Sequence, residues 1–445
     1  MTYFSNHQKK ISALFIALSI LSTIGLCEVL LVIFSPVAMV TSGYKLTENG
    51  QKYGWGFDPF QLVRVVNPDT GVSYQDRVNA QGWRDVEHNI INTNKSFRIL
   101  VLGDSNTYGY IVPRDALYTR VLEKKLNELG YNVEIISMGY SGWGTDQQLE
   151  ALKKEGLRYR PDLVIFQITS NDLDDNFFWR KKGKFGTRKP FYYKLNDRGE
   201  VVRHTNKRFF NHLSKVSRNY IISRSQILMR AELIKEKLRV ALCDPFAFGP
   251  AQVQQFYLET GESLPLDFIA SSRRRGKCGF TLDQLDHLLD KSGLQSKRKL
   301  IVNIASWPRF DEIISKTRYQ MEDMDYNNEK WDLLFALIGQ ASALVQQSGG
   351  KLALISDQEE GHYNWLRYWH RISGDPITKK RYYMHVDHLR EFAQANNIGF
   401  VESRRKIQRA LRDPHPDIIG NIAMAENILE FVLSNFSERL GQKML

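Results

Sequence analysis

Short apolar runs rich in branched residues alternate with helix-like segments, and this alternation constrains the fold more than any other feature of the chain. Each run has the length of a buried strand, and helical periodicity fills the intervals between runs. Strands that alternate with helices form a parallel sheet covered on both faces. We therefore predict an α/β fold with strands at 97–102, 132–136, 162–168, 351–355 and 398–402 and helices at 117–129, 146–159, 331–347, 379–395 and 418–435.

The first of these runs ends in a corner that carries a candidate nucleophile. Gly103, Asp104 and Ser105 follow the run directly, and a glycine at such a corner lets the backbone turn sharply. We expect Ser105 at the carboxyl edge of the sheet, near the start of the next helix. Ligands bind at that edge in open α/β sheets, and free N–H groups at a helix start favour an anion. The alternative is a serine that only caps a helix.

Three further segments carry the residue types that a hydroxyl nucleophile requires. A glycine-rich loop around Gly142 follows the second run, and Asn171 follows the third. Asp413 and His415 stand near the C-terminus. A serine hydroxyl is a weak nucleophile until a base takes its proton, and the base needs a third group to orient it. Serine, histidine and aspartate meet this need in any chain order.

With these motifs in this order, the sequence resembles the SGNH (GDSL-type) serine hydrolases over about residues 82–433, with a long interruption. The segment 79–85 also resembles the lead-in of membrane-anchored bacterial members. The resemblance implies a flavodoxin-like three-layer α/β/α parallel sheet, the SGNH hydrolase fold. The residues to which it assigns roles are Ser105 as nucleophile, His415 as base, Asp413 as the acid that orients the base, and Ser105, Gly142 and Asn171 as the oxyanion hole.

The sequence departs from the family pattern at three points. Thr169 stands where the family usually has glycine, two residues before Asn171, and Ser137 stands where the second block usually opens with asparagine. The acid and the base are separated by one residue instead of two, with prolines that favour an extended path. These departures bear on the orienting role of Asp413 and leave the nucleophile and the base untouched.

The combined pattern predicts a serine esterase that hydrolyses an acyl ester. The resemblance and the expected location favour an O-acetyl ester on a cell-surface or secreted carbohydrate. Two alternatives stay open: an acyltransferase that uses the same triad, and a non-catalytic protein that binds glycan or organises a membrane assembly. We expect no cofactor and no metal, because the ten histidines form no metal-binding spacing and no phosphate-binding loop is present.

The N-terminal region predicts a membrane anchor. Ile11–Phe34 is an apolar stretch of 24 residues with a single charge, Glu28, and about 20 such residues span a bilayer. The stretch is longer than the core of a cleaved signal peptide. Lys9 and Lys10 precede it and favour a cytoplasmic N-terminus, so the catalytic domain is expected in the periplasm or otherwise outside the cytoplasm. For Glu28, a partner helix and an outer position within reach of water are both open, and we favour the second.

A long insertion at about 177–328 carries the basic excess of the chain. Residues 176–300 hold 26 lysines and arginines against 11 aspartates and glutamates, a difference of +15, whereas the whole chain is +12. This charge predicts contact with anionic lipid or an acidic glycan, or else a solvated basic surface; nucleic acid is not expected. The basic clusters lie at 181–184, 273–277 and 297–299, and a basic amphipathic helix is expected at 221–240. The insertion also contains aromatic side chains that could stack on sugars, namely Phe177, Phe178, Trp179, Tyr192 and Tyr193.

These features divide the chain into a tip and anchor at 1–40, a lead-in at 41–95, a hydrolase-like domain at 96–435 and a tail at 436–445. Cys243 and Cys278 both lie in the insertion, where an oxidising compartment would permit a disulfide between them. Two unpaired thiols are equally compatible with the sequence.

Overall fold

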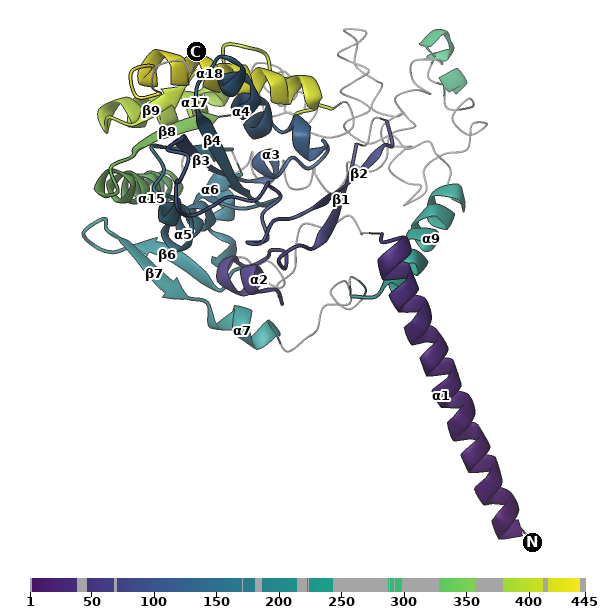
Figure 1. The fold of residues 1–445 in the computed structure, drawn as a ribbon. Coiled ribbons are helices and arrows are strands. Elements are labelled where there is room, and N and C mark those ends of the chain that lie inside the picture. Colours follow the sequence, from purple (N-terminus) through teal and green to yellow (C-terminus); the bar gives the residue numbers. More distant parts are fainter. Residues whose placement is uncertain are drawn as a thin grey trace. The chain divides into compact units, whose positions relative to one another are not determined.

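The fold of this chain is taken from a computed structural model (Figure 1). The chain divides into two compact units, one of residues 1–40 with 215–242 and one of residues 41–214 with 243–445. Asp413, both cysteines of the insertion, and the basic clusters at 181–184 and 273–277 lie outside the described residues. The residues that the structure describes are 2–37, 46–67, 70–169, 171–180, 186–213, 222, 224–242, 287, 289–291, 293–297, 328–356, 379–410 and 415–440.

A five-stranded parallel sheet forms the centre of the larger unit, with the strand order β4-β3-β5-β8-β9. The order changes direction between β3 and β5, which is the arrangement of a flavodoxin-like sheet and creates a crevice at the carboxyl ends of these two strands. The predicted parallel sheet is therefore confirmed. Its strands are β3 (Phe97–Gly103), β4 (Val133–Gly139), β5 (Leu163–Ile168), β8 (Lys351–Ser356) and β9 (Gly399–Val401).

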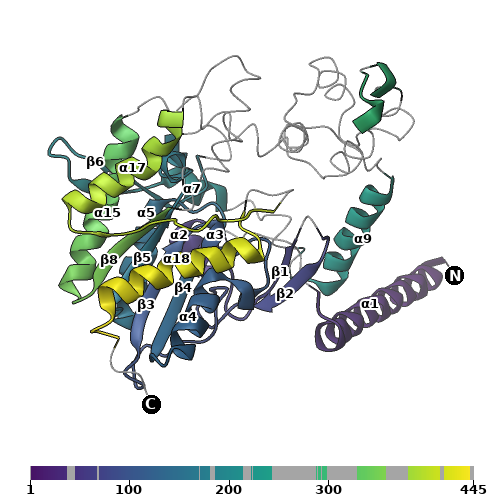
Figure 2. The same ribbon diagram turned by 90° about the horizontal axis from the view of Figure 1, so that it is seen from above.

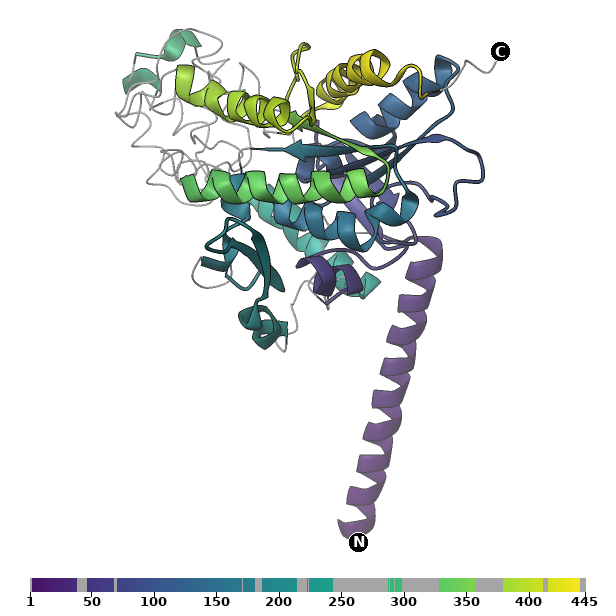
Figure 3. The same cartoon turned by 90° about the vertical axis from the view of Figure 1, so that its left-hand side faces the viewer.

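Helices cover both faces of the sheet, because each strand carries apolar side chains on both of its faces. Ile99 and Val101 of β3 pack with α4 and α18, while Leu100 and Leu102 pack on the opposite face with α5, α15 and α17. Figure 2 shows α18 running beside α4, and in Figure 3 the yellow α18 and the green α15 lie on opposite sides of the strands. These helices are α4 (Tyr118–Glu128), α5 (Thr145–Lys154), α15 (Asn328–Gln347), α17 (Lys379–Ala395) and α18 (Ile418–Phe436).

One predicted helix is shorter than expected. The periodicity predicts a helix over 146–159, but α5 ends at Lys154 and a separate 3-10 helix, η2 (Gly156–Tyr159), follows. The break lies where the chain packs closely on the sheet, because a Cβ atom at Gly156 would lie 2.6 Å from Leu100 Cδ2. The helical periodicity of the sequence does not reveal this close packing, so the predicted helix is longer than α5.

Within the larger unit, the lead-in packs through aromatic side chains on the loop that follows β4. It contains α2 (Glu48–Tyr53) and an antiparallel hairpin of β1 (Leu62–Val66) and β2 (Ser73–Arg77). Tyr53 and Trp83 are fully buried, and both donate hydrogen bonds to the carboxylate of Glu155, at 2.9 and 3.0 Å. Their rings contact those of Tyr140 and Trp143 on the loop after β4. The lead-in thus supports the loop that carries Gly142.

The first part of the insertion adds an antiparallel hairpin, β6 (Phe191–Leu195) and β7 (Val201–Thr205), followed by α7 (Lys207–Leu213). Of the five aromatic side chains considered for sugar stacking, Phe177, Phe178 and Tyr193 are buried in the core. The other two, Trp179 and Tyr192, stack on each other with ring centroids 4.6 Å apart. Core packing therefore accounts for the three buried rings.

In the smaller unit, α1 (Thr2–Phe34) carries the apolar stretch, and α9 (Gln226–Leu242) overlaps most of the predicted amphipathic segment at 221–240. Ile11–Phe34 is long and apolar enough to cross a membrane, and none of it is buried. Glu28 on α1 accepts hydrogen bonds from the start of α9: from the Ser225 hydroxyl at 3.0 Å, the Ile227 N–H at 3.1 Å and the Gln226 N–H. A helix N-terminus stabilises an anion, so Glu28 has a partner helix from its own chain.

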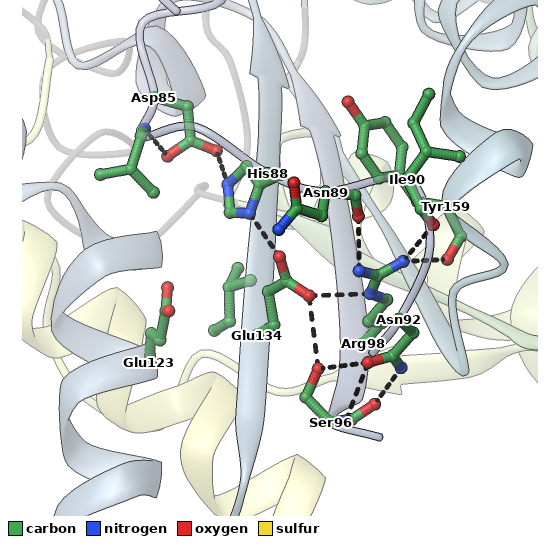
Figure 4. A network of polar contacts seen from close by, with 12 residues as sticks. Asp85, His88, Asn89, Ile90, Asn92, Ser96, Arg98, Glu123, Glu134 and Tyr159 are labelled. Atoms are coloured by element: carbon green, nitrogen blue, oxygen red, sulfur yellow. Dashed lines mark hydrogen bonds and ion pairs between the residues drawn. The ribbon is translucent and has the colours of Figure 1, made fainter. Parts of the chain in front are cut away.

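A network of polar side chains joins the lead-in to the sheet (Figure 4). His88 lies between two carboxylates, with Nε2 3.0 Å from Asp85 Oδ2 and Nδ1 2.8 Å from Glu134 Oε1. Arg98 on β3 donates to Glu134 Oε2 at 2.7 Å and also to the carbonyl groups of the lead-in and of Tyr159. Burial alone would lower the pKa of His88, but its hydrogen bonds to Asp85 and Glu134 raise the pKa to about 9.

We expect this network to make the free energy of unfolding depend on pH. The unfolded pKa of histidine is about 6.5, so His88 contributes fully below that pH, and its contribution is lost as pH rises through about 9. A shift of this size corresponds to stabilisation on the order of 3 kcal/mol. The difference in unfolding free energy between wild type and His88→Gln should therefore shrink between pH 6 and pH 9.5, as measured by denaturant unfolding. A difference that is constant over this range would contradict the assignment.

Candidate active site

The three predicted strand-end motifs follow neighbouring strands of the sheet. In the parallel register Gly103 lies opposite Gly139, and Leu102 lies opposite Phe166. Ser105 and Asn171 thus follow the two strands that flank the crevice, and Gly142 follows β4 on the other side of β3. The predicted nucleophile and both other predicted oxyanion donors therefore follow the carboxyl ends of three adjacent strands.

Ser105 begins a single helical turn, α3 (Ser105–Tyr108). Asp104 caps this turn by accepting a hydrogen bond from the Asn106 N–H at 2.9 Å. The preceding corner requires glycine, because a Cβ atom at Gly103 would lie 2.0 Å from Thr107 Oγ1. Ser105 is largely buried, with 9% of its surface exposed. A serine on such a tight turn matches the corner predicted from the sequence.

The Gly142 loop is held from the lead-in. Gly142 has a φ of +74°, a conformation that residues with a side chain rarely adopt. The indole N–H of Trp55 donates to the Ser141 carbonyl at 2.9 Å. The Tyr140 hydroxyl accepts from the Phe57 N–H at 3.1 Å. Sequence reasoning missed Trp55, because its contact with the loop depends on how the lead-in folds back over β4.

Asn171 immediately precedes α6 (Asp172–Asp175), and both ends of its side-chain amide are engaged. Its Nδ2 donates to Asp175 Oδ2 at 2.8 Å, and its Oδ1 accepts a hydrogen bond from the Thr169 hydroxyl. Only one of the two Nδ2 hydrogens is needed for the contact with Asp175. The other hydrogen is available to a ligand.

Asp172 lies behind this amide and is fully buried. Its carboxyl group accepts from the Thr145 hydroxyl at 2.7 Å, from the Thr169 N–H at 2.8 Å and from the Gln148 side chain at 3.2 Å. None of these donors is charged. Burial and the neighbouring charge of Asp104 raise the pKa of Asp172 well above its usual value. Sequence reasoning identified the Asn-Asp corner, but the burial of this carboxyl group is a property of the tertiary structure.

Two lysines contact α6, one at the Asp174 carboxylate and one at the Asp175 backbone carbonyl. Lys330 on α15 pairs with Asp174 at 2.9 Å. Lys189 donates to the Asp175 carbonyl at 2.6 Å and also forms a buried ion pair with Asp146 at the start of α5. Removing one partner of a buried pair is strongly destabilising. These contacts fix the helix that follows the Asn171 corner.

His415 lies beside the turn that follows the nucleophile. Its ring is 5.1 Å from that of Tyr110, measured between centroids. The Tyr110 N–H in turn donates to the Ser105 carbonyl at 3.3 Å. An antiparallel bridge between Arg409 and Pro416 holds the segment that carries His415. The structure thus brings His415, which is more than 300 positions from Ser105 in the sequence, to the turn next to it.

A second aspartate near His415 caps a helix. Asp417 caps α18, because its Oδ1 accepts from the Gly420 N–H at 2.8 Å. Its Oδ2 accepts from Gln408 Nε2 at 2.7 Å. Both carboxylate oxygens of Asp417 are therefore engaged by groups of its own segment. Within the residues that the structure covers, no group of three or more histidine, cysteine, aspartate or glutamate side chains is arranged to hold a metal ion.

Comparison with known proteins finds similarity in the region that contains Ser105, Gly142 and Asn171. Residues 101–194 match the sequence model of the GDSL-like Lipase/Acylhydrolase family. An arylesterase from Vibrio mimicus is 35% identical over 77 residues, which are 17% of this chain and 38% of the relative. The alignment with this curated relative thus spans less than half of its length.

Solved structures resemble the chain at low similarity. They include TesA (10% identity, TM-score 0.32, covering 75% of this chain and 97% of that structure). A lipase/acylhydrolase from Enterococcus faecalis has 10% identity and a TM-score of 0.29, covering 76% and 95%. An acetylxylan esterase from Geobacillus stearothermophilus has 9% identity and a TM-score of 0.31, covering 75% and 93%. Residues 101–194 of this chain are thus similar to the GDSL-like lipase/acylhydrolase family, and the five-stranded parallel sheet of the chain has the strand order of a flavodoxin-like fold.

Proposed function

We propose that the chain is a membrane-anchored serine esterase that hydrolyses an acyl ester. The observation that carries the proposal is the position of Ser105, on a capped turn at the carboxyl end of strand β3, at the point where the strand order changes direction. Three supporting features are the match of residues 101–194 to an acylhydrolase family, the nearby Asn171 corner and the position of His415 beside Tyr110.

The proposed reaction has two steps. Ser105 Oγ attacks the ester carbonyl while His415 takes its proton, and the leaving alcohol departs with that proton. Water then attacks the acyl-enzyme with His415 again as the base, which releases the acid and frees Ser105. Asp413 holds the tautomer of His415. The N–H groups of Ser105 and Gly142 and the Asn171 amide stabilise the oxyanion, and each such donor contributes about 3–4 kcal/mol to lowering the barrier.

The proposed substrate is an O-acetyl or other acyl ester on a cell-surface or secreted carbohydrate. It follows from the location outside the cytoplasm that the anchor implies. An acyltransferase would use the same triad with a sugar hydroxyl in place of water, and a non-catalytic protein would bind the glycan without turnover. The basic insertion would bind anionic lipid headgroups or an acidic polysaccharide, through contacts that added salt weakens.

The test of the proposed function is turnover of 4-nitrophenyl acetate by the purified full-length chain in detergent. Turnover that depends on Ser105 supports the esterase, and its absence favours a binding protein. Repeating the assay with an added glycan acceptor separates hydrolase from transferase, because only a transferase yields acylated glycan. The products can be distinguished by mass.

The proposed topology places residues 1–10 in the cytoplasm and residues 41–445 outside it. The exposed apolar helix Ile11–Phe34 and the preceding Lys9 and Lys10 support it. Protease added outside sealed spheroplasts should digest an epitope at the C-terminus and leave an epitope before residue 10 intact. A cytoplasmic protein of the same cells serves as the control for sealed membranes. Protection of the C-terminal epitope would show that the orientation is reversed.

A further inference from the structure

The Thr169 hydroxyl connects the nucleophile turn with the Asn171 corner. Thr169 is buried at the end of β5. Its Oγ1 lies 3.0 Å from Asp104 Oδ2 and 3.0 Å from Asp172 Oδ2, and it is also hydrogen-bonded to Asn171 Oδ1. Asp104 caps the turn that begins with Ser105. A single hydroxyl group therefore touches side chains on both sides of the crevice.

The Thr169 hydroxyl has more acceptor neighbours than it has hydrogens to donate. A hydroxyl group has one hydrogen, but Thr169 Oγ1 faces three oxygen atoms that would all accept it. Its single hydrogen can go to only one of them, and the contact with Asn171 Oδ1 is the shortest of the three. Burial and the nearby carboxyl groups of Asp104 and Asp175 favour the neutral form of Asp172, which then does not compete for this hydrogen. Of the two remaining acceptors, Asn171 Oδ1 lies closer to Thr169 Oγ1 than Asp104 Oδ2 does, so the hydrogen points to the amide oxygen.

We propose that Thr169 is a positioning residue for the oxyanion hole, and that its hydroxyl fixes the orientation of the Asn171 amide. Thr169 holds the amide oxygen and Asp175 holds one amide hydrogen. These two contacts leave the second hydrogen as the free donor. Without the hydroxyl, the amide can rotate and exchange its oxygen and nitrogen. This inference rests on the proposed esterase function and adds a residue to its machinery.

The test is the steady-state hydrolysis of a fluorogenic acetyl ester by the full-length chain in detergent. Thr169→Val removes the hydroxyl and keeps the shape of the side chain. A loss of one oxyanion donor lowers kcat by about 100- to 1,000-fold, so a disoriented donor should lower kcat by about 10- to 100-fold, with KM nearly unchanged. Thr169→Ser, which restores the hydroxyl, should recover most of kcat. The matched control is Thr119→Val, because Thr119 is buried on α4 and its hydroxyl has no hydrogen-bond partner among the described residues.

A double-mutant cycle with Asn171→Ala separates positioning from a structural role. If Thr169 acts through Asn171, Thr169→Val should have almost no further effect once the amide is absent. An equal loss of kcat in both backgrounds, or a Thr169→Val enzyme with normal kcat, would overturn the inference and leave the esterase function intact. A folded wild-type chain without ester turnover and without labelling by a fluorophosphonate would refute the function and the inference together.

Discussion

Replacement of Ser105 by alanine is expected to abolish ester hydrolysis and covalent labelling by an active-site-directed fluorophosphonate. The loss should be at least about 10,000-fold in kcat, because removing the nucleophile leaves only binding and the oxyanion donors. The fold should persist, because the turn is capped by Asp104 and held by the hydrogen bond from the Gly109 N–H to the Ser105 carbonyl, at 2.9 Å. Gel fluorescence of the labelled full-length chain and ester turnover measure both effects.

The matched control is Ser342→Ala. Ser342 is a buried serine on α15 whose hydroxyl accepts a hydrogen bond from the Gln346 side chain at 3.3 Å. It lies on the same chain, outside the three strand-end motifs. This variant should keep both turnover and label. Equal labelling of Ser105→Ala and wild type would show that another residue is the nucleophile.

Replacement of His415 by alanine should abolish turnover as well, with a loss of similar size. Ser105 then has no base, and no other histidine occurs in the C-terminal segment after residue 388. His204→Ala is the matched control, because His204 lies on β7 and stacks on Tyr192 with ring centroids 5.1 Å apart. Normal turnover of His415→Ala would refute its role as base.

The orienting acid can be tested in the same series. Asp413→Asn should lower kcat by up to about 10,000-fold, as an asparagine favours the wrong tautomer of the base. Asp417→Asn should instead leave turnover nearly unchanged, because asparagine caps a helix about as well as aspartate does and Asp417 caps α18. Near-normal activity of Asp413→Asn would mean that another group orients His415.

Much of the fold could be predicted because its elements are local. The buried strand β3 is a continuous apolar run, and α17 follows the predicted range, Lys379–Ala395. Helix α5 ends earlier than predicted, at Lys154, just before Gly156, where a side chain would collide with Leu100. The positions of Ser105 and Asn171 also followed from the sequence, since the carboxyl ends of parallel strands meet at one edge.

Polar contacts between distant segments could not be predicted in this way. Glu28 stood as a lone charge in the apolar stretch, and only the structure shows the start of α9 bound to it. The same holds for His88, whose raised pKa depends on Asp85 and Glu134. The contacts of Glu28 with α9 and of His88 with Glu134 join residues far apart in the sequence, and such a separation leaves no periodic pattern.

The sequence by itself determined the alternation of strands and helices, the Gly-Asp-Ser corner and the apolar N-terminal stretch. These features are local, because hydrophobic periodicity and turn chemistry act over a few residues. Only the tertiary structure decided that Thr169 faces Asp104, Asn171 and Asp172 at once. Burial removes water from this cluster, so its carboxyl and hydroxyl groups must form hydrogen bonds with the groups that the fold places beside them.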